Sequence, residues 1–276
     1  MWENEQRNAQ AQQAEQGHYE EAQPVIDINM VDADAVSGYI ARVFGWMFIG
    51  LLVTALTTVG IVIGIENSFA FAGAIDMLFN MFLVVAIAQV ALVWIISGRV
   101  TKMNPGTCKF LFILYAAMNG LTFGFVALVF AYQVFDYPMQ TIGMTFGITS
   151  VSFGIMAVYG LVTKKDLTRF GNLLFMGLIG LIIASVANMF IGGSALDLAV
   201  IVFGLFLFMG LTAYHTHNIK HNFAQIALSD NGAEAIGARV DQEALASNLA
   251  IVGALSLYLA FINMFMFILR LLARRN

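Results

Sequence analysis

His215, His217 and His221 form one close cluster of titratable side chains in this sequence. In a helix, His217 and His221 would share a face because they are four residues apart, while His215 would point elsewhere. Imidazoles bind metal ions, but a metal site needs at least a third ligand, and the neighbouring sequence offers none. We therefore expect no metal and no other cofactor. Two roles stay open for His215, a side chain at the boundary between apolar and aqueous phases or a pH sensor, because imidazole titrates near neutrality.

Motifs of enzyme active sites are missing from the chain. It contains no G-x-S-x-G, no H-E-x-x-H and no P-loop, and its long apolar stretches lack Asp, Glu, Lys and Arg. We therefore expect a protein that is not an enzyme. Charged residues inside a membrane normally mark ion pathways, so the usual pointer to a transport site is missing too. The polar side chains within the apolar stretches that we consider as candidate pore or sensor positions are Gln89, Asn119, His215, Tyr258 and Asn263.

The composition of the chain indicates a membrane protein. Of the 276 residues, 60% are hydrophobic and 11% are charged, whereas soluble domains carry about 25% charged residues. The chain is therefore expected to be a multi-pass protein of the cell membrane that has the lipid bilayer as its main contact. A net charge of −4 argues against a nucleic-acid partner.

Seven apolar segments are each long enough to cross a bilayer. They lie at Phe44–Ile65, Met77–Ser97, Phe110–Gln133, Met139–Val162, Asn172–Ile191, Leu198–Ile219 and Leu245–Leu269. Since lipid offers no partners for free backbone groups, each segment must be helical. The sequence thus predicts an all-α bundle of seven transmembrane helices over residues 44–276. An acidic, Gln-rich tail and lead-in precede it over residues 1–43, too polar at its start to bury a core.

The positions of Lys and Arg predict a cytoplasmic N-terminus. The N-terminal tail and the second, fourth and sixth connections carry Arg7, Arg42, Arg99, Lys102, Lys109, Lys164, Lys165, Arg169, Lys220 and Arg239. In the first, third and fifth connections all charged residues are acidic. Seven crossings would place Arg270, Arg274 and Arg275 outside, against this rule, so the last segment either crosses or re-enters, and its length favours crossing.

Three pairs of glycines have the four-residue spacing that permits close approach of membrane helices. They are Gly60 with Gly64, Gly120 with Gly124, and Gly143 with Gly147. Because glycine is common in membrane helices, packing within one bundle explains them better than a dimer motif does.

Five separated stretches together resemble the Bax inhibitor-1 family, also called the transmembrane Bax inhibitor motif family. The stretches are FGWMFIGLLVTAL (44–56), AVYGLVTKKDL (157–167), MGLIGLIIA (176–184), GLTAY (210–214) and GALSLYLAFINMFMFILR (253–270). The resemblance covers residues 40–272. It implies a seven-helix bundle whose last helix lies near the centre.

Bacterial members of this family are described as pH-sensitive calcium leak channels gated by two aspartates. The resemblance places those aspartates at His215 and Ala260, and it places a glutamate common in the family at Gln89. Two close carboxylates can share a proton and act as a latch, which a histidine and an alanine cannot do. Calcium also prefers anionic oxygen ligands, which these positions lack. The resemblance therefore implies the family fold without the two-aspartate switch.

Two functions remain open at this stage. The first is a leak pathway for cations, calcium among them, that has lost its acid switch. The second is regulation of, or interaction with, other membrane proteins such as a membrane-bound protease. The acidic tail and the long connection from His221 to Glu243 would serve as docking segments for such a partner.

Overall fold

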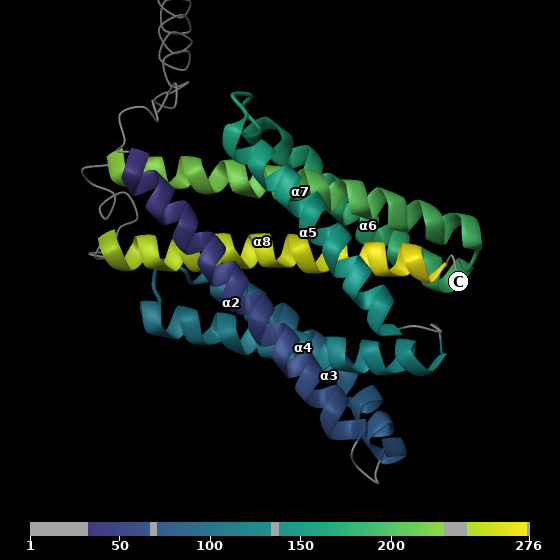
Figure 1. Ribbon diagram of the computed structural model, residues 1–276. Coiled ribbons are helices and arrows are strands. Elements are labelled where there is room, and N and C mark those ends of the chain that lie inside the picture. Colours follow the sequence, from purple (N-terminus) through teal and green to yellow (C-terminus); the bar gives the residue numbers. More distant parts are fainter. Residues whose placement is uncertain (1–32, 67–70, 134–137, 229–241, 275–276) are drawn as a thin grey trace, which may run out of the picture.

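The computed structural model describes residues 33–66, 71–133, 138–228 and 242–274, and within these ranges the chain contains helices and no strand. The helices are α2 (Ala33–Glu66), α3 (Phe71–Gly98), α4 (Pro105–Gln133), α5 (Pro138–Val162), the short 3-10 helix η2 (Thr168–Phe170), α6 (Gly171–Ile191), α7 (Ser194–Leu228) and α8 (Gln242–Ala273) (Figure 1). Each predicted apolar segment falls inside one of them, so the prediction of an all-helical protein is confirmed.

Helix α2 begins well before the predicted start of its apolar segment at Phe44. The extra turns carry Val36, Tyr39 and Val43, all buried against neighbouring helices, so tertiary packing lengthens the helix beyond the hydrophobic run. Residues 1–32 of the predicted acidic tail lie outside the described residues, as do residues 229–241, which connect α7 to α8.

Six of the described helices are long and apolar enough to cross a membrane by length and composition. In α3 the residues whose side chains are described, Val84–Gly98, form a further apolar helical stretch. Many large apolar side chains lie exposed on the outer faces of these helices. A broad exposed apolar surface is typical of a protein solvated by lipid. The chain is therefore a membrane protein with several spanning helices.

Local sequence explains where two of the helices begin. The Asn104 side chain accepts a hydrogen bond from the Gly106 backbone N–H at 2.9 Å, and Pro105 occupies the first position of α4. Asparagine is a preferred N-cap, and proline suits a first turn whose N–H groups have no partner in the helix. Between α6 and α7 the chain turns through Gly192 and Gly193, whose φ angles of 63° and 139° favour glycine.

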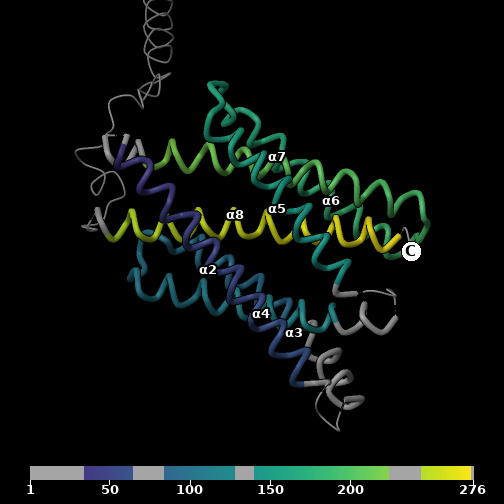
Figure 2. The backbone as a smooth tube through the Cα atoms, viewed as in Figure 1, coloured from purple at the N-terminus to yellow at the C-terminus, as the bar shows by residue number. Residues whose placement is uncertain are grey.

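Helix α8 packs against α2, α4, α5 and α7, and half of the residues in its most apolar window are buried. In Figure 2, α7 and α8 run alongside each other while α2 and α5 cross them. Helix α6 lies at the periphery and packs mainly against α7, with 6% of its apolar window buried.

The two ends of the α7–α8 pair show that these helices are antiparallel. A Cβ atom on Gly204 would lie 2.5 Å from the Phe267 ring, and one on Gly253 would lie 3.2 Å from Ile219. Helix α8 is unbroken, so its chain does not turn back on itself as a re-entrant segment would.

The end of α8 is held beside the start of α7 by an ion pair. Arg274 Nη1 donates to Asp197 Oδ2 at 2.7 Å, and Arg274 Nη2 donates to the Ser194 carbonyl at 2.6 Å. Asn188, near the end of α6, donates to the other oxygen of Asp197 at 3.3 Å. Three helix ends therefore meet at this edge of the bundle.

Of the three glycine pairs, one forms a close helix contact. A Cβ atom on Gly120 would lie 2.5 Å from Thr57 Cβ and 2.8 Å from the Thr54 carbonyl, and one on Gly124 would lie 3.0 Å from Ile61. This pair brings α4 against α2 within one bundle, as predicted. The other two pairs have open space around the position of a Cβ atom.

Candidate functional site

A buried polar node joins α2, α4 and α8 in the interior of the bundle. Tyr258 is fully buried, and its hydroxyl lies 2.7 Å from Thr54 Oγ1. The Thr54 hydroxyl in turn lies 2.9 Å from the carbonyls of Gly50, in its own helix, and Ala116, in α4. Since Thr54 can donate only one proton, it donates to these carbonyls and accepts from Tyr258. The node thus satisfies both hydroxyls without water.

Two of the predicted candidates, Tyr258 and Asn119, are connected through Tyr115. The Tyr258 ring makes edge contacts with the rings of Phe112 at 6.0 Å and Tyr115 at 5.8 Å between centroids. Asn119 is buried and donates from Nδ2 to the Tyr115 carbonyl at 3.1 Å. Thr54 was not among the predicted residues. The sequence feature that could have pointed to Thr54 is the group of threonines at 54, 57 and 58 in the first apolar segment.

Gln89 and Asn263 serve other contacts. Gln89 Nε2 donates to Thr122 Oγ1 at 3.0 Å and so links α3 to α4. Asn263 Nδ2 donates to the Leu259 carbonyl of its own helix at 2.8 Å. The six predicted positions therefore do not converge on one point among the described residues.

His215 and Ala260 lie on the adjacent helices α7 and α8. Ala260 is buried and His215 is half-buried with its ring 5.5 Å from that of Tyr214. No carboxylate is among the buried polar side chains that the structure describes.

The other buried hydroxyls also serve the backbone. The threonines at 145, 149, 212 and 216 each donate to the carbonyl four residues earlier in α5 or α7. Calcium binds six to eight oxygens, and carboxylates usually dominate its sites. Among the described residues there is no group of three His, Cys, Asp or Glu side chains that could hold a metal ion. The described interior therefore lacks a calcium site built from carboxylates.

His217 and His221 share one face of α7, as their spacing predicts, with ring centroids 4.4 Å apart. His217 is buried, and neither of its ring nitrogens has a hydrogen-bond partner in the described structure.

Asp166, in the connection between α5 and η2, is exposed and accepts from the side chain and backbone N–H of Thr168. These hydrogen bonds hold the pKa of Asp166 below its usual value, and Arg169 contributes less. Its carboxylate therefore stays ionised at neutral pH.

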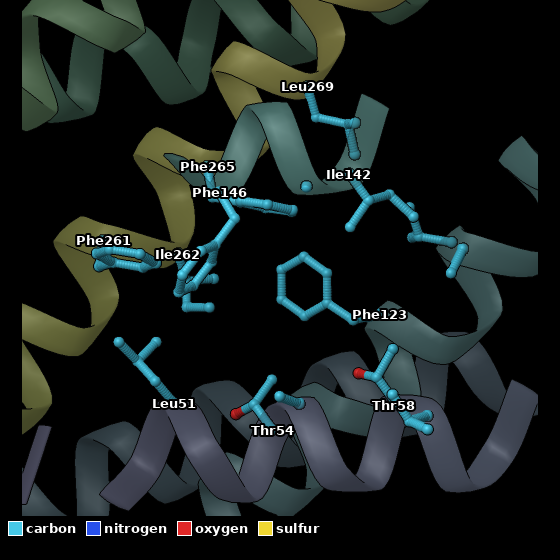
Figure 3. Close-up of a pocket in the computed structure, with 15 residues that line it drawn as sticks. Leu51, Thr54, Thr58, Phe123, Ile142, Phe146, Phe261, Ile262, Phe265 and Leu269 are labelled. Carbon is cyan, nitrogen blue, oxygen red and sulfur yellow. The ribbon is translucent and has the colours of Figure 1, made fainter. Parts of the chain in front are cut away.

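Next to the Thr54 node lies a cavity of about 430 Å³ between α2, α4, α5 and α8 (Figure 3). Its walls are hydrocarbon, with Leu51 from α2, Phe123 from α4, Ile142 and Phe146 from α5, and Phe265 from α8 around it. Thr54 and Thr58 are the hydroxyl-bearing residues in its lining. This cavity was not predicted from the sequence.

Comparison with known proteins gives one family. The family model described as "Inhibitor of apoptosis-promoting Bax1" matches residues 36–276. Inner membrane protein YbhL of Escherichia coli K12 is 39% identical over 244 residues, which are 86% of this chain and 92% of the relative. An uncharacterized protein of Deinococcus radiodurans is 36% identical, covering 86% of this chain and 91% of that protein. One of Borreliella burgdorferi is 35% identical, covering 86% and 92%.

Proposed function

The chain belongs to the Bax inhibitor-1 family of membrane proteins, and from this we propose that it is a cation leak pathway, permeable to calcium, without the family's acid switch. The observation that carries the second half of this proposal is the lack of a buried carboxylate among the described side chains. Without two close carboxylates there is no shared proton to gain as the pH falls.

The charges near the histidines support the same proposal. Asp166 is the described carboxylate whose charge acts on His217 and His221. Because its pKa is lowered, it does not change charge in the neutral range. His215 has no carboxylate opposite it in the described part of α8, so it has no partner with which to form a latch.

Calcium flux into liposomes tests the proposal. We expect the flux of the unchanged protein to be the same at about pH 8 and about pH 6, the range in which histidine titrates. We expect His215→Asn to leave this profile flat. The double variant His215→Asp with Ala260→Asp should gain acid sensitivity, while Ala260→Asp alone should not. A steep rise of flux on acidification in the unchanged protein would refute the loss of the switch, and a lack of any flux would refute the leak.

We also propose that the chain lies in the cell membrane, like its relative YbhL, and crosses it seven times with a cytoplasmic N-terminus and with α8 near the centre of the bundle. The unbroken α8, its contacts with four other helices, and the meeting of Arg274 with Asp197 support this topology. Labelling of single cysteines placed at Lys164 and Ser194 from outside intact cells tests it. Labelling at Ser194 and protection at Lys164 are expected, and the reverse pattern would contradict the orientation.

A second candidate function is regulation of other membrane proteins, such as a membrane-bound protease. The observation in its favour is α6, which packs mainly against α7 and leaves a broad apolar face exposed. A photo-crosslinking residue at Phe175 on this face should capture a protein partner, whereas the same residue at Val151 on α5 should capture lipid. Equal adducts at both positions would argue against a partner at α6. Deletion of residues 1–34 tests whether the tail contributes to the same complex.

A further inference from the structure

The lining of the cavity beside Thr54 reaches the apolar outer surface of the spanning helices. Val59 on α2 and Phe146 on α5 line it and are 50% and 52% exposed on the outer surface of the helices. Val59 belongs to the spanning segment Asp34–Gly64, five residues before its end, and Phe146 belongs to Gln140–Val162, six residues after its start. A lipid beside these helices can therefore reach the cavity from the side of the bundle.

Water is a poor occupant for this cavity. The Thr54 hydroxyl is already bonded to Tyr258 and to backbone carbonyls, and Thr58 Oγ1 donates to the Gly120 carbonyl at 3.1 Å. The other lining residues are apolar. A buried water needs about two to four polar partners, and cavities without them stay dry. The same argument excludes a hydrated cation.

An empty cavity is also unfavourable, because the surrounding side chains lose the dispersion contacts that a filled space would give them. A dry cavity of about 150 Å³ is large enough to take up benzene. The present cavity, at about 430 Å³, has room for a longer hydrocarbon.

We propose that this cavity binds the acyl chain of a membrane lipid. The lipid belongs to the leaflet that adjoins the C-terminal end of α8, because the cavity is lined by the C-terminal half of that helix, up to Leu269. No charged residue lines the cavity, so the recognition is of the hydrocarbon chain and the headgroup stays outside. The site adds to the proposed leak function and does not depend on it.

A bound chain would fill the space between α2, α4, α5 and α8 next to the Thr54 and Tyr258 hydroxyls. It would therefore keep this part of the bundle free of water, whichever helices a permeating ion follows. The bound acyl chain would thus take the place of core side chains, and the membrane would supply it.

Tryptophan quenching by lipids with brominated acyl chains tests the proposal in the full-length protein. The native tryptophans, Trp2, Trp46 and Trp94, are replaced by Phe, and Phe123→Trp places a single reporter deep in the cavity. A variant that keeps only Trp94 serves as the reference for bulk lipid, because this side chain is 77% exposed on α3. We expect the quenching of the Phe123→Trp reporter to approach that of Trp94.

A blocking variant separates chain binding from general exposure to lipid. Gly143 lines the cavity, and a Cβ atom there would meet open space, so Gly143→Leu can extend into the cavity. Gly147 lies one turn later on the same helix, is equally open, and does not line the cavity, so Gly147→Leu is the matched control. Gly143→Leu should reduce the quenching of the reporter, and Gly147→Leu should not.

Two results would overturn the proposal. A reporter that brominated chains fail to quench shows an empty or closed cavity, and a reporter quenched by water-soluble acrylamide shows a wet one. If Phe123→Trp does not fold, Phe265→Trp on α8, whose ring lies 5.7 Å from that of Phe123, gives the same readout, and Ala127→Leu provides a second blocking variant.

Discussion

Removing either partner of the hydrogen bond between Tyr258 and Thr54 should lower stability by a different amount, because the group left behind differs. Tyr258→Phe removes the phenol hydroxyl but leaves Thr54 donating to a backbone carbonyl. Hydrogen bonds between membrane helices contribute about 0.6 kcal/mol on average and about 1.7 kcal/mol at most. We expect Tyr258→Phe to lower the free energy of unfolding by an amount within this range.

Thr54→Val should cost more. It leaves the Tyr258 hydroxyl fully buried without an acceptor, and an unsatisfied buried polar group costs about 1–3 kcal/mol. The adjacent cavity offers it no relief, because its remaining walls are apolar. In the double variant both polar groups are gone, so its loss should be smaller than the sum of the two single losses.

Unfolding by SDS in mixed micelles, followed by circular dichroism, measures the free energy of unfolding of the unchanged protein, the two single variants and the double variant under the same conditions. Thr57→Val is the matched control, because the Thr57 hydroxyl donates to the Val53 carbonyl of its own helix at 2.8 Å and, among the described residues, joins no second helix. We expect this control to change stability little. Strictly additive losses in the double variant, or a larger loss for Tyr258→Phe than for Thr54→Val, would refute the proposed direction of donation.

Three further substitutions probe helix contacts in the same unfolding assay. Gly120→Ala should cost about 1–3 kcal/mol because its new Cβ atom would collide with α2, whereas Gly60→Ala, with open space around it, should cost nothing. Asn248→Ala removes hydrogen bonds of 2.9 and 2.7 Å to the carbonyls of the α3–α4 connection, and hydrogen exchange in that connection should become faster. Arg274→Ala breaks an ion pair whose side chains are 29% and 39% exposed, so it should cost about 0.2–1 kcal/mol, and less at high salt.

Equal effects of the two glycine substitutions would contradict the close contact between α2 and α4. Unchanged exchange in the connection would mean that Asn248 does not hold it, and a salt-independent loss at Arg274 would point to packing instead of charge.

The sequence by itself determined the helical class and the positions of the apolar helices. Runs of about 20 apolar residues leave a membrane chain no alternative to helices, because lipid cannot satisfy free backbone groups. It also determined the family, since separated stretches agreed in order.

Only the tertiary structure decided which polar residues meet. The helices are apolar on all sides, so hydrophobic periodicity does not define which face points inward. Tyr258 was predicted as a candidate but its partner Thr54 was not, because the two are far apart in sequence and their contact depends on the rotation of α2 and α8. Asn248 and its partners in the α3–α4 connection are similarly distant.

The cavity is the clearest product of the tertiary structure. Its walls come from four helices, and each wall residue taken alone resembles any other side chain that faces lipid. The space lies between α2, α4, α5 and α8, and no local sequence pattern records a missing contact. Sequence determines what each helix can bury, whereas the crossing of the helices determines what remains unfilled.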